Sequence, residues 1–196
     1  MSEPRLKMLI INGSVRPGNY TAMASAVVAD ELGKDSDVAV ETIDPSTLEL
    51  PPPGLPGSVD TKELQEKVRQ ASGIVLATPE YHGRFSSVMK LVIENLGFPS
   101  VLSGKLVALL GVAAGSIGAI KSLEQLRGVC AHVGAIALPL PISVPNVQKA
   151  FAPDGTCTDP AVEKLIWRVG TGLLDYVRRS VCPRVQLEQL LREGAA

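Results

Sequence analysis

The sequence predicts an α/β fold in which a five-stranded parallel sheet carries helices on both faces. First, apolar segments of strand length alternate with amphipathic segments of helix length along the chain. Second, several strand segments are continuous apolar runs, as is typical of strands buried on both faces. Third, the chain has 196 residues, of which 45% are hydrophobic and 20% charged. This is the balance of one ordinary domain of about 100–200 residues, so we expect a single domain over 1–196, with a core at about 7–181 and a tail at 183–196.

The first strand, helix and second strand follow from the N-terminal region. The apolar run at 8–11 stops at an Asn-Gly pair and is predicted to be a strand. The segment 21–32 has a helical pattern, and Gly33 is expected at its C-terminal cap. The segment 38–43, rich in β-branched residues, is predicted to be the second strand.

A Pro/Gly-rich loop at 51–57 separates these elements from the next helix and strand. The segment Asp60-Thr61-Lys62-Glu63 resembles a capping box, so we expect a helix from there to about 72. The apolar run at 74–77 is predicted to be the third strand, stopped by Pro79.

The second half continues the alternation. Leu123 and Leu126 lie on one helical face, and Asp159-Pro160 suits the first turn of a long helix. The loop at 141–159 is long enough to be functional or to reach a partner, and the Leu/Glu/Arg-rich tail after Pro183 is expected to form a short exposed helix. The predicted elements are a helix at 88–96, strands at 106–112 and 136–140, and helices at 120–133 and 159–179.

Charge, cysteines and histidines exclude several classes of protein. The formal net charge is −1, which excludes a nucleic-acid binder that works through bulk charge. Cys130, Cys157 and Cys182 are far apart, so we expect reduced thiols in a cytoplasmic protein. Two histidines are too few for a His-rich metal site, and no bound metal is predicted. We expect no signal peptide and no membrane span, because no apolar run approaches about 18 residues.

The loops after the first, third and fourth predicted strands should build the functional site. In open parallel sheets, ligands bind beyond the carboxyl ends of the strands. The first loop, 13–21, leads into a helix N-terminus, where unpaired N–H groups and the helix dipole favour anions. Ser14, Asn19 and Thr21 add neutral donors, and Arg16 adds a planar cation suited to phosphate. The loop therefore predicts a phosphate site.

Two better-known phosphate motifs are excluded. Gly13 and Gly18 have the spacing of a Walker A motif, but Asn19-Tyr20 stand where Lys-Ser/Thr is required. Val15 occupies the second glycine position of the dinucleotide fingerprint.

The second loop, 78–86, favours a flat ring with polar edges. Tyr81 and Phe85 offer flat apolar surface, and backbone groups remain available at the rim. His82 is either a donor to such a ring or a solvent-facing loop histidine. The third loop, 111–119, is rich in small residues that leave its backbone free to line a pocket.

These residues resemble the NADPH-dependent FMN reductase family over about 7–144. The resemblance is carried by Gly-Ser-x-Arg at 13–16, Pro-Glu-Tyr-His-Gly at 79–83, and Gly-Ser-x-Gly at 115–118 leading to Glu-Gln-Leu-Arg at 124–127. It implies a flavodoxin-like three-layer sandwich with strand order 2-1-3-4-5. The family includes flavin, azo, quinone and chromate reductases.

The resemblance also implies a role for individual residues. The phosphate of FMN would be held by Ser14, Arg16, Asn19, Tyr20 and Thr21. The isoalloxazine ring would lie along Pro79, Glu80, Tyr81, His82 and Gly83. The Glu80 side chain either turns into the site or matters less than the Glu80 backbone. Its pyrimidine edge would lie near Gly115, Ser116 and Gly118. The family often has Ser at position 19 and Asn at position 82, and both replacements keep hydrogen-bonding capacity.

The implied activity is a ping-pong reduction that uses FMN and NADPH, with NADH as the alternative donor. Hydride would pass through FMN to a flavin, quinone, azo compound or metal oxyanion, and no catalytic side chain is predicted. Arg84 either meets the phosphates of the nicotinamide nucleotide or is a solvated surface residue. The family commonly forms dimers and tetramers, so a homodimer or homotetramer is expected.

Two other classes of protein remain as alternatives. A flavodoxin-like electron carrier would bind FMN without pyridine-nucleotide activity, but such carriers are typically strongly acidic. A non-enzymatic FMN-binding sensor would show no turnover. An iron–sulfur flavoprotein is disfavoured, because the cysteines are not clustered.

Overall fold

The computed structural model describes residues 6–139 and 141–181. Its sheet has the order β2-β1-β3-β5-β6, with β7 also paired to β5, and all of these pairs are parallel. Setting aside the short hairpin strand β4, this is the predicted 2-1-3-4-5 order, which is confirmed. The strands are β1 (Leu6–Asn12), β2 (Val38–Ile43), β3 (Gly73–Tyr81), β4 (Arg84–Phe85), β5 (Leu106–Val112), β6 (Ile136–Ala137) and β7 (Ile142–Val144).

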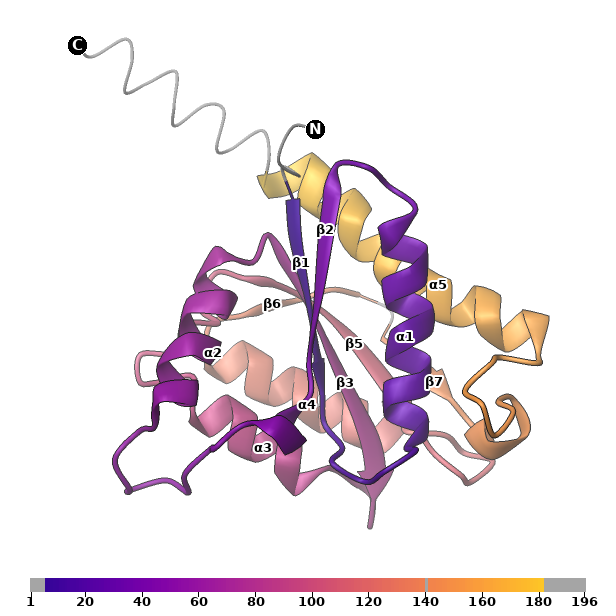
Figure 1. The fold of residues 1–196 in the computed structure, drawn as a ribbon, viewed down its shortest axis with the longest axis horizontal. Coiled ribbons are helices and arrows are strands. Elements are labelled where there is room, and N and C mark those ends of the chain that lie inside the picture. Colours follow the sequence, from indigo (N-terminus) through magenta and orange to yellow (C-terminus); the bar gives the residue numbers. More distant parts are fainter. Residues whose placement is uncertain (1–5, 140, 182–196) are drawn as a thin grey trace, which may run out of the picture.

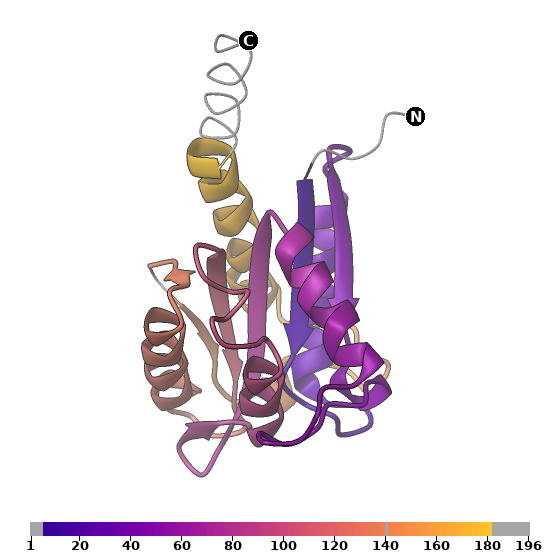
Figure 2. The ribbon, with the colours of Figure 1, turned by 90° about the vertical axis from the view of Figure 1, so that its left-hand side faces the viewer.

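Five α-helices cover the two faces of the sheet, as predicted. Helices α1 and α5 lie together on one side, and α2, α3 and α4 lie on the other (Figures 1 and 2). The α-helices are α1 (Tyr20–Gly33), α2 (Val59–Gln70), α3 (Ser87–Glu94), α4 (Ile120–His132) and α5 (Pro160–Tyr176). No helix among the described residues is long and apolar enough to cross a membrane.

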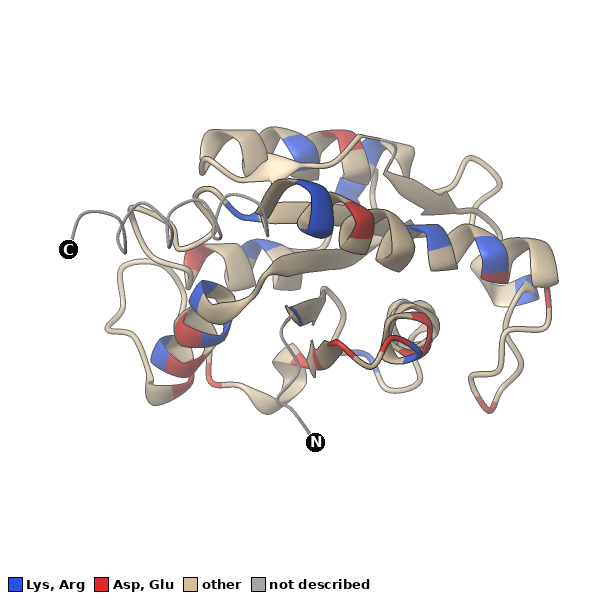
Figure 3. Ribbon diagram, turned by 90° about the horizontal axis from the view of Figure 1, so that it is seen from above, with Lys and Arg blue, Asp and Glu red and all other residues tan. Residues whose placement is uncertain are grey.

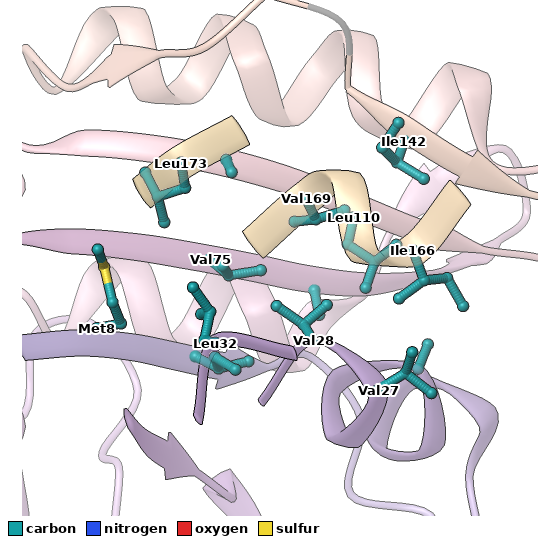
Figure 4. Packing of buried hydrophobic residues seen from close by; sticks show 14 of the residues in the cluster. Met8, Val27, Val28, Leu32, Val75, Leu110, Ile142, Ile166, Val169 and Leu173 are labelled. Atoms are coloured by element: carbon teal, nitrogen blue, oxygen red, sulfur yellow. The ribbon is translucent and has the colours of Figure 1, made fainter. Parts of the chain in front are cut away.

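The core consists of two apolar layers, one on each face of the sheet. On the first face, Val28 and Leu32 of α1 meet α5 above the sheet (Figure 4). Gly170 allows this close approach, because a Cβ there would lie 3.0 Å from Leu32 Cγ. On the second face, α2, α3 and α4 contribute residues such as Leu64, Met89 and Leu126. Burial on both faces explains the continuous apolar runs of β1, β3 and β5.

The surface carries charges of both signs along the helices (Figure 3). Arg178, in the π-helical turn Val177–Val181 that continues α5, pairs with Asp35 at 2.6 Å between Nη2 and Oδ2. The backbone N–H of Asp37 and the Arg178 guanidinium lower the pKa of the Asp35 carboxyl. This exposed pair joins the end of α5 to the turn after α1.

Two expectations about where elements end are wrong. Strand β3 does not stop at Pro79 but continues to Tyr81. The last β1 pair is Asn12 with Ala77, so Pro79 lies beyond β1, where its missing N–H interrupts no bond to that strand. Gly33 does not cap α1, because it is the last helical residue and Lys34 is the C-cap in right-handed helical geometry.

The predicted capping box at 60–63 is also wrong, because the motif lies two residues earlier. Ser58 is the N-cap of α2; its hydroxyl accepts from Thr61 N at 3.0 Å, and the Thr61 hydroxyl accepts from Ser58 N at 3.4 Å. A Thr side chain therefore takes the place that Glu or Gln usually has in this motif.

The predicted strand at 136–140 and loop at 141–159 are replaced by a different arrangement. Two short strands, β6 and β7, pair with opposite ends of β5 and are separated by Pro139 and Pro141, which lack the N–H donors of a regular ladder. The following segment contains a 3₁₀ turn at Val147–Lys149, and Phe151 is buried in the core. The segment therefore packs on the domain instead of forming a plain loop. The tail at 183–196 and Cys182 lie outside the described residues.

Candidate functional site

A cavity of about 380 Å³ lies at the carboxyl edge of the sheet, where β1, β3 and β5 end. This edge is at the bottom of Figure 1, near the end of β3. The volume is within the range of about 300–1,000 Å³ typical of small-molecule sites. The cavity is lined by Arg16, Pro17, Gly18, Asn19, Tyr20, Thr21, Pro79, Glu80, Tyr81, Val112, Ala113, Ala114 and Val147.

The first loop begins with a close contact to the sheet. Gly13 N donates to Ala77 O at 2.7 Å, and a Cβ at Gly13 would lie 2.9 Å from the same oxygen. The next residue, Ser14, is 4% exposed. Its hydroxyl oxygen is the only buried side-chain N or O without a hydrogen-bond partner within 6–139 and 141–181. Because buried polar groups are nearly always paired, the unpaired hydroxyl indicates a place where a polar ligand atom binds.

The N-terminus of α1 adds further donors to this loop. Asn19 is the N-cap, and its Oδ1 accepts from Ala22 N at 2.8 Å. Its Nδ2 donates to Arg16 O at 2.7 Å, so the side chain expected to donate to a phosphate already holds the loop in shape. The N–H groups of Tyr20 and Thr21 precede the first acceptor within the helix and are the donors typical of anion sites. Arg16 is exposed at the cavity and makes no ion pair with any described residue.

The second loop forms a two-residue hairpin between β3 and β4. Its central residues, His82 and Gly83, have φ of 52° and 72°. Positive φ at both central residues is the geometry of a type I′ turn, which strongly favours Asn-Gly. His82 thus occupies a position where the turn requires a positive φ. Its side chain is exposed and does not line the cavity.

The hairpin presents two different faces. Tyr81 pairs with Arg84, and Glu80 pairs with Phe85. Because opposite residues of an antiparallel pair project to the same face, Arg84 shares the face of Tyr81, which lines the cavity. Phe85 packs on the core beside α4, and the Glu80 side chain contacts the same helix.

Three hydrogen bonds join the hairpin to α4. Glu80 Oε2 accepts from Ser122 N at 3.1 Å and from Ser122 Oγ at 3.2 Å. Gln125 Nε2 donates to Gly83 O at 3.2 Å. The Glu80 carboxylate is thus directed to the helix.

The third loop contributes its first residues to the cavity and its later residues to the surface. Ala113 and Ala114 line the cavity, whereas Gly115 and Ser116 are exposed and, like Gly118, do not. Gly118 has φ of +78°, and a Cβ there would lie 2.3 Å from Ser143 Oγ. The positive φ and the close contact with Ser143 therefore explain why position 118 is a glycine.

The structure brings the three predicted loops together around one cavity. Seven predicted site residues line it: Arg16, Asn19, Tyr20, Thr21, Pro79, Glu80 and Tyr81. Ser14, His82, Gly83 and Arg84 belong to the same loops without lining it. Val112 lies within the predicted third loop, 111–119, whereas no sequence signal marks Val147, which follows β7 and was not assigned to the site.

The residues present fit a ligand that combines a phosphate with a flat ring. The buried Ser14 hydroxyl, the α1 N-terminus and Arg16 suit an oxyanion. Tyr81, Val112 and Ala113 offer apolar surface beside them. The described residues contain no group of three or more His, Cys, Asp or Glu that could hold a metal ion.

Comparisons with known proteins agree with this description. Residues 6–149 match the family model described as NADPH-dependent FMN reductase. The chain is 32% identical over 158 residues to an FMN-dependent NADPH-azoreductase of Staphylococcus haemolyticus, covering 77% of this chain and 83% of the relative. It is 30% identical over 185 residues to an NAD(P)H-dependent FMN reductase of Pseudomonas aeruginosa, covering 89% and 96%. Among solved structures, a flavoenzyme NAD(P)H:(acceptor) oxidoreductase of Paracoccus denitrificans shares the fold, with a TM-score of 0.74, 19% identity and coverage of 89% and 98%.

Proposed function

Since the chain belongs to the NADPH-dependent FMN reductase family, we propose that it passes hydride from NADPH through FMN to a small-molecule acceptor. The proposed acceptors are a flavin, a quinone, an azo compound or a metal oxyanion. When bound, FMN supplies the redox chemistry, and the protein supplies binding and position. We further propose a ping-pong order, in which the oxidised nicotinamide leaves before the acceptor takes its place, and a homodimer or homotetramer in the cytoplasm.

The buried, unpartnered Ser14 hydroxyl beside the α1 N-terminus carries this proposal. In it, Ser14 and the N–H groups of Tyr20 and Thr21 bind the FMN phosphate, while Asn19 keeps the loop in shape. Arg16 neutralises the phosphate charge from the open side of the cavity. Each contact is of a kind that oxyanions accept.

In the same proposal, the backbone of Pro79–Gly83 meets the edge of the isoalloxazine ring. Tyr81 covers part of the ring, and Arg84, on the same hairpin face, attracts the phosphates of NADPH. Gly115, Ser116 and Gly118 border the pyrimidine edge. No side chain is assigned a proton transfer or a covalent role.

The test combines cofactor retention with reduction. The purified chain is incubated with FMN, desalted, and titrated anaerobically with NADPH while its absorbance spectrum is recorded. Retained flavin bands that bleach support the proposal. Bands that persist with both NADPH and NADH would instead indicate a carrier or sensor, and a chain with no measurable FMN affinity would refute the proposed function.

Arg16→Ala tests the phosphate site directly. A hydrogen bond to a charged group contributes about 1.5–3 kcal/mol, so we expect the Kd for FMN to rise about 10- to 100-fold without unfolding. Arg168→Ala, at an exposed position on α5, is the matched control. Unchanged FMN affinity in Arg16→Ala would remove Arg16 from the site.

A further inference from the structure

Helix α4 begins without a capping side chain of its own. Its N-cap residue is Ala119, and its first turn contains no acidic residue. The Ala119 N–H is satisfied by Ser143 Oγ at 2.8 Å. In the first turn, Ser122 N donates to Glu80 Oε2 at 3.1 Å, so a carboxylate from another element takes the place of the missing cap. A negative charge at this end of a helix is stabilising.

The residue that supplies this cap also belongs to the hairpin. Glu80 lies directly before Tyr81, and both line the cavity. The hairpin itself has only two cross-strand pairs, Glu80 with Phe85 and Tyr81 with Arg84. Such a short ribbon is not stable alone, so its position depends on what holds it from outside.

Helix α4 holds the hairpin at two points, one turn apart. Glu80 is bound at Ser122, and Gly83 O accepts from Gln125 Nε2 at 3.2 Å. The first contact fixes the strand, and the second fixes the turn. Together they set where the backbone groups of the hairpin stand relative to the cavity.

We propose that Glu80 is a positioning residue: by capping α4, its carboxylate holds the hairpin backbone against the FMN ring, and Gln125 assists at the turn. This inference rests on the proposed function for its ligand. It assigns the Glu80 carboxylate to the helix and only the Glu80 backbone to the cofactor. A positioning role differs from general stabilisation because its loss loosens the hairpin while the sheet stays intact.

The test uses Glu80→Ala, Glu80→Gln and Gln125→Ala, with Glu124→Ala as the control. Glu124 is exposed on the same turns of α4 and makes no hydrogen bond or ion pair with any described residue. Hydrogen exchange is measured on the FMN-free chain, so this readout does not depend on the cofactor. The Kd for FMN is measured by flavin fluorescence titration.

We expect hairpin amides at 81–84 to exchange at least tenfold faster in Glu80→Ala, while amides of β1 and β5 keep their wild-type rates. The Kd for FMN should rise about tenfold in Glu80→Ala. In Glu80→Gln, which keeps an acceptor oxygen of the same reach, the rise should be about threefold. The effects of Glu80→Ala and Gln125→Ala should be non-additive in the double variant, because both contacts hold one hairpin. Glu124→Ala should stay within twofold of wild type.

Wild-type exchange of the hairpin in Glu80→Gln and Gln125→Ala would overturn the proposal, even where Glu80→Ala fails to fold. Unchanged FMN affinity in variants whose hairpin does loosen would also overturn it. A wild-type chain that binds no FMN would refute the proposed function separately, because the exchange experiment would still report whether Glu80 holds the hairpin.

Discussion

Ser86 connects the first loop, 13–21, to α3, and the loss of its hydroxyl has a calculable cost. Its hydroxyl donates to Gly13 O and accepts from Met89 N at 3.0 Å as the N-cap of α3. Ser86 is 2% exposed, so water cannot replace either partner freely. Losing an N-cap costs about 0.5–2 kcal/mol, and a buried carbonyl left unpaired costs about 1–3 kcal/mol.

We therefore expect Ser86→Ala to lower the free energy of unfolding by about 2–4 kcal/mol. This is a large part of the roughly 5–15 kcal/mol typical of a domain, but it leaves the chain folded. The assay is urea unfolding of the FMN-free protein followed by circular dichroism. For a domain of this size, the melting temperature should fall by roughly 4–16 °C.

Ser87→Ala is the matched control for this prediction. Ser87 is the first residue of α3, is exposed, and makes no side-chain hydrogen bond with any described residue. The same atoms are removed one position away, so the change should stay within about 0.5 kcal/mol. If Ser86→Ala and Ser87→Ala unfold at the same urea concentration, the reasoning about the Ser86 contacts is refuted.

Two further predictions concern the third loop and the cysteines. Gly118→Ala should lower the free energy of unfolding by about 2–3 kcal/mol, because an L-residue at positive φ loses about 1–2 kcal/mol and the new Cβ overlaps Ser143 Oγ. In the same urea assay the control Gly115→Ala, whose new Cβ meets nothing within 4 Å, should be nearly neutral. Equal stabilities of the two variants would contradict this prediction. Burial raises the pKa of the Cys130 thiol to about 11, so at pH 8 iodoacetamide should alkylate the partly exposed Cys157 well before Cys130. Peptide mass mapping measures the two rates, and equal labelling in the folded chain would show that Cys130 is accessible.

The layered fold could be predicted because its cause is local. Strands β1, β3 and β5 are covered on both faces over their central residues, so those residues must be apolar, and the sequence shows them as continuous apolar runs. Because the strands run parallel, the loops that follow them lie together at the carboxyl edge of the sheet. The cavity therefore gathers the first and second predicted loops and the start of the third.

The parts that the sequence did not predict depend on contacts between distant residues. Pro79 appeared to be a strand terminator, because the sequence does not show that β1 ends two residues earlier. The cap of α4 could not be predicted for the same reason, because its acceptor, Glu80, lies 42 residues before Ser122 in the sequence. Similarly, the glycine at position 118 is required by Ser143 on β7, and the path of β7 could not be read from a Pro-interrupted segment.

These long-range contacts show how the proposed cofactor site can depend on residues that do not themselves meet the cofactor. Ser86 joins the first loop, 13–21, to the base of the hairpin, where its N–H also donates to Thr78 Oγ1 at 3.1 Å. Glu80 ties the same hairpin to α4. The proposed phosphate and ring sites therefore share one hydrogen-bonded frame. Because the cofactor carries the chemistry, substitutions in this frame should damage the reaction through FMN position, before any change in the residues that meet the acceptor.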